Sequence, residues 1–163
     1  MIGTSGQEKK GVIQLADKLS AAKMTLSLAE SCTGGLVSSL ITNIPGSSSF
    51  FYGALIAYSN MIKTGMLDVP SEIIASKGAV SAQTAEAMAV NTRLKFATDI
   101  SGAITGIAGP GGGSADKPVG TAYMAVATAK GVFSKRIMSS GTREEVKCSF
   151  AQELIWFLSE SIR

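Results

Sequence analysis

Histidine is absent from this sequence of 163 residues, and its absence excludes several kinds of active site. Without an imidazole the chain cannot form a Ser-His-Asp triad, a Cys-His pair or a histidine-ligated metal centre. Only two cysteines occur, Cys32 and Cys148, and their wide separation in the sequence gives no support to a cysteine-rich zinc site. Any hydrolytic reaction therefore needs a base other than histidine, and we expect neither a metal nor an organic cofactor.

Signals for membranes, secretion and nucleic acids are also missing. No apolar run approaches the ~20 residues that a membrane span needs, and the first residues lack the apolar core of a signal peptide. The net charge of +3 is small, and the basic residues are scattered rather than clustered with aromatic residues. We therefore expect a cytoplasmic protein with reduced cysteines, which has neither a membrane nor a nucleic acid as its partner.

Segments with helical and extended patterns alternate along the chain. With 45% hydrophobic and 17% charged residues, the composition is that of a globular domain with a proper core. A hairpin turning at Lys130-Gly131 requires at least one antiparallel pair of strands. The patterns predict an α/β fold with helices on both faces of a mixed, roughly five-stranded sheet. The expected strands are 24–29, 50–58, 100–107, 119–128 and 132–139.

Several helix boundaries carry specific signals. Ser5 with Glu8 and Thr142 with Glu145 have the spacing of capping boxes, and Ser81 is a candidate N-cap. Apolar residues recur at helical spacing behind both capping boxes. The first stripe comprises Val12, Leu15, Ala16 and Leu19, and the last comprises Val146, Phe150, Leu154, Leu158 and Ile162.

The segment Ala29-Glu30-Ser31-Cys32-Thr33-Gly34-Gly35 joins a predicted strand to a predicted helix. Ser31 would then stand at the helix N-terminus, where free backbone amides can bind an oxyanion or a carboxylate. The paired glycines would allow close approach by a substrate or another backbone segment. Ser31 could equally be an ordinary helix cap, and spacing alone does not separate the two interpretations.

A candidate base follows the next predicted strand. Tyr58 ends that strand, and Asn60 can cap a helix that carries Lys63 in its first turn. A cation at that end is disfavoured by the helix dipole, and partial burial would lower the lysine pKa toward that of a working base. The simpler alternative is a solvated lysine beside a core tyrosine.

Two further segments could bind an anion. Residues 105–113 follow a predicted buried strand, and their exposed amides could cradle a phosphate. This loop lacks the ending of a P-loop and could be a flexible connection instead. Arg143, at the start of the last helix, could grip a phosphate or carboxylate through its planar guanidinium, or lie exposed without a ligand.

Six motifs together make the sequence resemble the C-terminal domain family of the competence/damage-inducible protein CinA, which also occurs alone as nicotinamide-nucleotide amidase. The resemblance runs from about Val12 to Leu158, so we expect residues 1–163 to form one such domain, without the larger N-terminal domain of some members. It implies a three-layer α/β/α fold. The motifs are AESCTGG at 29–35, PGSS at 45–48, YSNMIK at 58–63, GAVS at 78–81, TGIAGPGGG at 105–113 and KPVG at 117–120.

The resemblance also implies an activity, the hydrolysis of nicotinamide mononucleotide (NMN) to nicotinate mononucleotide and ammonia in pyridine-nucleotide salvage or a stress response. Ser31 matches the nucleophile, and Tyr58 and Lys63 match its partners. Serine-lysine pairing is a known form of nucleophilic catalysis and suits a chain without histidine. The expected oxyanion site is the backbone of Cys32 and Thr33, and the expected substrate-binding residues are Glu30, Gly34, Gly35, Thr105, Gly106, Ala108, Gly109 and Arg143.

Several alternatives stay open at this point. Glu30 would face the cationic pyridinium or merely orient its loop. Cys32 could replace Ser31 as nucleophile, although a thiol amidase would normally need a histidine. The chain could also be a non-catalytic nucleotide-binding module, in which case Ser31 and Lys63 need not meet. The expected partner is a small-molecule nucleotide, and a homodimer is compatible with the sequence.

Overall fold

The computed structural model describes residues 6–162, whose five strands form one mixed sheet in the order β2-β1-β3-β4-β5. Strand β1 pairs in parallel with both β2 and β3, whereas β3, β4 and β5 pair in antiparallel fashion. The predicted sheet and its hairpin are therefore confirmed. The strands are β1 (Leu26–Glu30), β2 (Phe51–Ile56), β3 (Ile100–Gly106), β4 (Thr121–Thr128) and β5 (Gly131–Met138).

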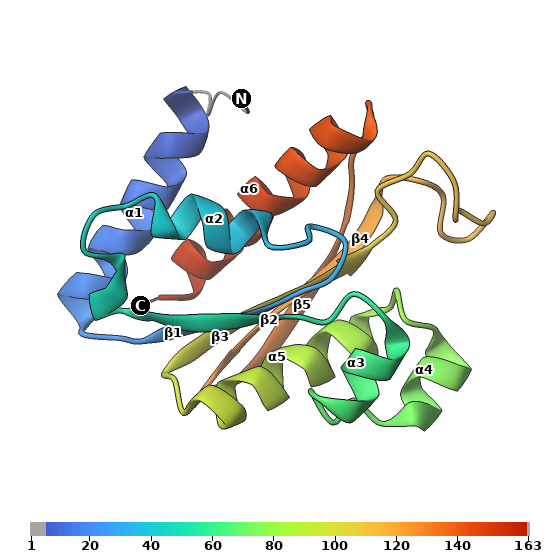
Figure 1. Cartoon of the computed structure of the whole chain (residues 1–163), viewed down its shortest axis with the longest axis horizontal. Helices are drawn as coiled ribbons and strands as arrows, with labels where there is room; N and C mark the ends of the chain where they lie inside the picture. The colour runs from blue at the N-terminus through green and yellow to red at the C-terminus, as the bar shows by residue number, and fades with distance from the viewer. Residues whose placement is uncertain (1–5, 163) are drawn as a thin grey trace.

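Helices cover both faces of this sheet, which makes three layers (Figure 1). One face carries α1 (Gly6–Ala22), α2 (Leu36–Thr42) and α6 (Arg143–Ser161). The other carries α3 (Asn60–Gly65), α4 (Ser71–Lys77) and α5 (Ala82–Phe96). The three-layer α/β/α expectation is thus confirmed. A short 3₁₀ helix, η1 (Ser47–Ser49), was not foreseen in the sequence.

The two faces of the sheet are packed by residues of different size, because successive strand side chains point to opposite sides. Leu28 of β1 and Ile104 of β3 belong to the core beneath α1, α2 and α6. Ala29 and Ala103, the next positions, belong to the core beneath α5. The small residues on one face let α5 approach the sheet closely. The larger aliphatic residues lie on the other face, beneath α1, α2 and α6.

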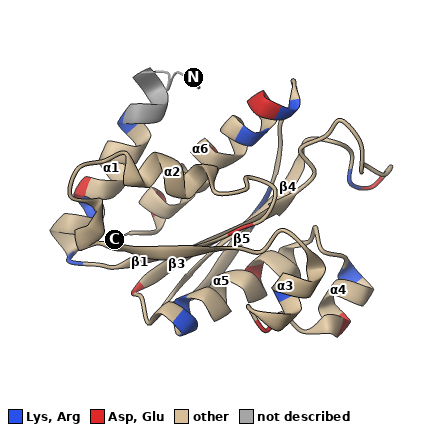
Figure 2. Ribbon diagram, viewed as in Figure 1, with Lys and Arg blue, Asp and Glu red and all other residues tan. Residues whose placement is uncertain are grey.

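Most of the helix signals in the sequence are confirmed. Thr142 and Glu145 form a complete capping box at the start of α6, and Ser81 caps α5 through the amide of Thr84. Ser5, the predicted cap of the first helix, lies outside the described residues. Within residues 6–162 no helix is both long enough and apolar enough to cross a membrane. Figure 2 shows basic and acidic residues dispersed over the helices and loops.

Candidate active site

The candidate site lies where the three parallel strands end. The chain continues from β1 into β2 on one side, whereas the other neighbour of β1 is β3. Such a topological switch point opens a crevice at the carboxyl ends of the strands. Ser31 follows β1 directly, and its amide donates to Ile104 O at 3.1 Å, which holds it beside β3.

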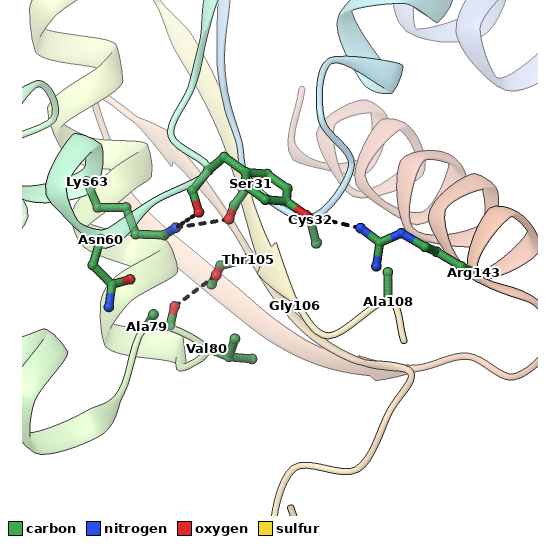
Figure 3. A pocket seen from close by; sticks show the side chains of 11 residues that line it. Ser31, Cys32, Asn60, Lys63, Ala79, Val80, Thr105, Gly106, Ala108 and Arg143 are labelled. Carbon is green, nitrogen blue, oxygen red and sulfur yellow. Dashed lines mark hydrogen bonds between the residues drawn. The ribbon is translucent and has the colours of Figure 1, made fainter. Parts of the chain in front are cut away.

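A cavity of about 170 Å³ occupies this edge of the sheet. It gathers residues from segments that are far apart in the sequence, as Figure 3 shows. The structure thus brings together most of the residues that the motifs single out. The expected site residues that line it are Ser31, Cys32, Tyr58, Lys63, Thr105, Gly106, Ala108 and Arg143.

Ser31 and Lys63 meet inside the cavity. Lys63 Nζ lies 2.9 Å from Ser31 Oγ, and the two residues are only 2% and 6% exposed. The same nitrogen lies 2.7 Å from the carbonyl oxygen of Ala57, which fixes its direction. Among the described residues no carboxylate forms an ion pair with Lys63. The lysine is therefore a buried amine whose contacts are neutral oxygens.

Burial lowers the pKa of Lys63 from its ordinary value, because the ammonium form loses its hydration. The nearby Cys32 opposes this shift only in part. The helix dipole, which we had expected to contribute, does not explain the shift. The helix α3 has six residues, and Lys63 lies in its last turn, where a cation is favoured. Its N-cap is also Ser59 rather than the expected Asn60.

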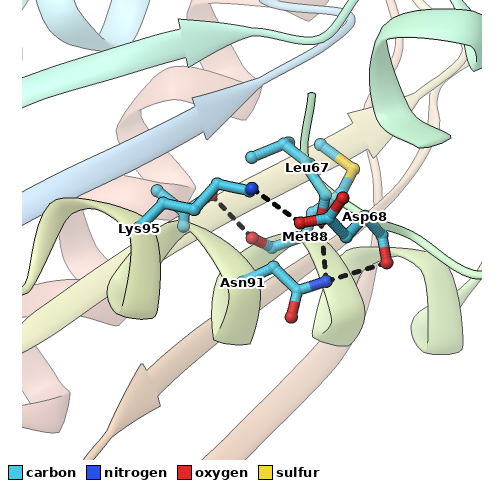
Figure 4. Close-up of polar contacts among 6 residues, drawn as sticks. Leu67, Asp68, Met88, Asn91 and Lys95 are labelled. Carbon is cyan, nitrogen blue, oxygen red and sulfur yellow. Dashed lines mark hydrogen bonds and ion pairs between the residues drawn. The ribbon is translucent and has the colours of Figure 1, made fainter. Parts of the chain in front are cut away.

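The chain after α3 is fastened to α5, and this holds the helix that carries the lysine. Asn91 Nδ2 donates to the carbonyl oxygens of Leu67 and Asp68 at 2.7 and 3.1 Å (Figure 4). Lys95 forms an ion pair with Asp68 at 2.6 Å, but both side chains are exposed, so the pair adds little stability. The amide of Val69 donates to Lys63 O at 3.0 Å and links this anchored segment to the lysine itself.

The expectation that Ser31 begins a helix is wrong. Residues 31–35 form turns, and α2 begins only at Leu36, with Gly35 as its N-cap at φ +95°. The reason is the buried carboxylate of Glu30, around which the turn folds. It accepts hydrogen bonds from Thr33 Oγ1 at 2.7 Å, from Gly35 N at 3.0 Å, and from the amide and hydroxyl of Ser38 at 2.8 and 2.6 Å.

Glu30 was expected either to face the substrate or to orient its loop. The first of these two expectations is wrong. The carboxylate of Glu30 is fully buried on the α2 side of the sheet, and the alternative role of orienting the loop agrees with its contacts. Thr33, Gly34, Gly35 and Gly109 also lie outside the cavity lining. Among the described residues the amides of Cys32 and Thr33 have no oxygen acceptor, and both lie within reach of the Cys32 sulfur beside the serine.

Cys32 is buried beside the serine in a form that is unfit for nucleophilic attack. Burial raises the pKa of its thiol to about 12, although the amides of Cys32 and Thr33 oppose the shift. A thiolate is the reactive species, so a thiol with this pKa is inert near neutrality. Together with the absence of histidine, this argues against the alternative in which Cys32 is the nucleophile.

Tyr58 and Arg143 form the exposed rim of the cavity. Arg143 donates one hydrogen bond to Gly109 O at 2.5 Å and another to Tyr58 Oη at 3.0 Å. Tyr58 is 61% exposed, and its hydroxyl contacts the arginine rather than Lys63. A route for the proton through Tyr58 is therefore unnecessary, because Lys63 reaches the serine directly. Five N–H groups belong to a guanidinium, so Arg143 keeps donors for a ligand.

The far wall of the cavity consists of backbone and small side chains. Thr105 Oγ1 donates to Ala79 O at 2.8 Å, which joins β3 to the segment before α5. At Gly106 a Cβ atom would come within 2.7 Å of Ala122 Cβ, so no larger residue fits there. Ala79 and Val80 were not expected in the cavity, and Asn60 was given only a capping role. All three lie within the motifs YSNMIK and GAVS, and this was the signal that could have found them.

No group of three or more histidine, cysteine or acidic residues suited to a metal ion occurs within residues 6–162. The chemistry that the side chains themselves offer is proton transfer between a buried serine and a buried lysine, with backbone amides beside the serine. This combination fits covalent attack on an acyl carbon.

Comparisons with known proteins agree with one another. The sequence pattern of the CinA C-terminal domain family matches residues 9–162. A CinA-like protein from Geotalea uraniireducens is 55% identical over 76% of this chain, and the match spans 29% of that protein. A competence/damage-inducible protein from Agrobacterium tumefaciens has the same fold, with 35% identity, a TM-score of 0.91 and 97% coverage of both chains. A CinA superfamily protein from Klebsiella pneumoniae gives a TM-score of 0.92 at 27% identity, with 95% and 97% coverage.

Proposed function

The chain belongs to the CinA C-terminal domain family, and on that premise we propose that it is an amidohydrolase that converts NMN to nicotinate mononucleotide and ammonia. The observation that carries the proposal is the 2.9 Å contact between Lys63 Nζ and Ser31 Oγ in a buried pocket without a carboxylate. The chain spans about a third of the length of the curated relatives that it matches, so the proposal concerns this domain.

The reaction begins with the neutral amine of Lys63, which takes the proton of the Ser31 hydroxyl. Ser31 Oγ attacks the carboxamide carbon, and the amides of Cys32 and Thr33 stabilise the oxyanion. The lysine ammonium then protonates the leaving nitrogen, the C–N bond breaks, and ammonia departs from an acyl-serine ester. A water molecule, deprotonated by Lys63, hydrolyses the ester and regenerates the serine. Arg143 at the rim attracts the anionic end of the nucleotide.

The two competing hypotheses have weaker support. A non-catalytic nucleotide-binding module would not require Ser31 and Lys63 to lie within hydrogen-bond distance of each other, yet they do. Such a module would also gain nothing from burying a lysine without an acidic partner, which costs free energy. A cysteine mechanism requires a thiolate that burial suppresses at Cys32.

An ammonia-release assay tests the proposal directly. The purified chain is incubated with NMN, nicotinamide riboside and NAD, and both ammonia and the carboxylate product are measured. We expect NMN to be the preferred substrate and to yield one nicotinate mononucleotide per ammonia. The Ser31→Ala protein is the control for contaminating amidases. Equal background rates from both proteins would overturn the proposed function.

A further inference from the structure

The cavity around Ser31 is too small for a whole nucleotide. Its volume is about 170 Å³, whereas pockets that enclose ligands of this size span roughly 300–1,000 Å³. A planar ring with its carboxamide can occupy it, but a ribose with a phosphate group needs further space. A second cavity of about 320 Å³ lies next to it, and Arg143 lines both. The two cavities together reach the expected size.

The second cavity is a groove between the start of α2 and the first turns of α6. Besides Arg143 it is lined by Leu36, Glu144, Lys147 and Cys148. Lys147 lies one turn after Arg143 on α6, so both side chains project from the same face of the helix. Figure 2 shows basic and acidic residues together at this end of α6.

Lys147 lies beside the turn that holds the nucleophile. A Cβ atom added at Gly34 would stand 3.8 Å from Lys147 Nζ, so the lysine nitrogen borders a stretch of bare backbone. Within residues 6–162 neither Lys147 nor Arg143 forms an ion pair with a carboxylate. Glu144 is the acidic residue of the groove lining, and it leaves the two cations in excess.

We propose that this groove binds the phosphate monoester of the substrate between Arg143 and Lys147, with Gly34 providing close approach to the backbone. The proposal rests on the proposed function for the identity of the nucleotide. It moves the phosphate away from the glycine-rich loop, because Gly111, Gly112 and Gly113 line neither cavity. Gly34 lines neither cavity itself, but it leaves the backbone beside Lys147 Nζ without a side chain.

Binding measurements on the Ser31→Ala protein test the groove without turnover. Isothermal titration with NMN and with nicotinamide riboside is compared for this protein, for its Lys147→Ala version and for its Lys130→Ala version. Lys130 is a matched control, because it lies at the β4–β5 turn at the opposite end of the sheet. We expect Lys147→Ala to weaken NMN binding at least about tenfold, the scale of one lost charge-assisted hydrogen bond, and to leave riboside binding unchanged.

The outcomes separate this proposal from the proposed reaction. Selective loss of NMN affinity in Lys147→Ala, with Lys130→Ala unaffected, supports the groove even if the unaltered enzyme releases no ammonia. Equal weakening for NMN and riboside, no weakening, or no NMN binding by the parent protein would each overturn it. Amide shifts of Gly34 and Lys147 on titration with inorganic phosphate provide a second measurement, and shifts confined to residues 109–113 would contradict the assignment.

Discussion

The pocket holds two pairs of polar side chains in contact. The contact distances of the two pairs are nearly equal, but their exposure to solvent is very different. Lys63 and Ser31 are 2.9 Å apart, and Arg143 and Tyr58 are 3.0 Å apart. The first pair is buried at the end of β1, whereas the second lies exposed at the rim. Each pair joins a nitrogen to a hydroxyl, so contact distance alone does not tell which pair does chemistry.

The difference follows from what burial does to each nitrogen. Water is excluded from Lys63, so its ammonium form is disfavoured and its pKa falls, which allows the amine to accept a proton. A guanidinium keeps its charge in nearly any environment, so Arg143 is suited to attract and orient an anion. The buried pair is thus matched to proton transfer and the exposed pair to recognition.

Removal of the nucleophile should have the largest effect. Ser31→Ala leaves the acyl carbon without an attacking oxygen, and we expect kcat for ammonia release to fall by about 10⁴-fold or more. NMN binding and the melting temperature should change little. The matched control is Cys32→Ala, which should keep most of the activity. The reverse pattern would remove Ser31 from the mechanism and give the role to the thiol.

Replacement of the base should come next. Lys63→Arg keeps a positive charge but cannot release its proton near neutrality, so it should lose about 10²–10⁴-fold in kcat/KM. Lys63→Met, which keeps the length and removes the nitrogen, serves as the control and should be equally inactive while it remains folded by circular dichroism. If Lys63→Arg retains more than about a tenth of the activity, Lys63 is not the base.

The buried lysine should also make both the activity and the stability of the protein depend on pH. For the unaltered enzyme kcat/KM should rise with pH through a limb that lies below the ordinary pKa of lysine, and Lys63 variants should lack that limb. Between the lowered pKa of the folded state and the unfolded value of about 10.4, only the unfolded chain holds the proton. The free energy of unfolding should therefore rise with pH in that window, by up to about 1.4 kcal/mol per pH unit. Urea titrations of Lys63→Met that retain this slope would contradict the assignment.

Changes in the exposed pair should affect substrate affinity more than turnover. We expect Arg143→Ala to raise KM for NMN by about 10- to 100-fold, the loss of charge-assisted contacts to a phosphate. Nicotinamide riboside should be a much poorer substrate than NMN for the unaltered enzyme and should be insensitive to this change. Steady-state kinetics with both substrates provide the measurement. Equal kcat/KM for the two would argue against a phosphate contact at Arg143.

The smallest effect should come from Tyr58→Phe. This change removes the hydroxyl that accepts a hydrogen bond from Arg143 and leaves the Lys63–Ser31 contact intact. We therefore expect a change of no more than about threefold, mostly in KM, as for the loss of one exposed hydrogen bond. A fall in kcat comparable to that of Lys63→Arg would show that Tyr58 relays the proton, and the contrast between the two pairs would then fail.

The sequence by itself determined the architecture and singled out the candidate site residues. Its periodic patterns predicted the strand and helix order, the hairpin and the capping box at Thr142, because these features depend on neighbours within a few residues. The absence of histidine narrowed the choice of base, and the motifs pointed to Ser31, Lys63 and Arg143 before any contact was known.

Only the tertiary structure decided how these residues are placed relative to one another. Glu30 was an ambiguous acidic residue in the sequence, and its burial beneath α2 turns residues 31–35 away from the expected helix. Lys147 carried no motif signal, and its place beside Gly34 arises from the packing of α6 against a segment more than a hundred residues earlier. Burial and long-range contacts set the pKa of Lys63 and the shape of both cavities, and neither quantity is encoded in local sequence patterns.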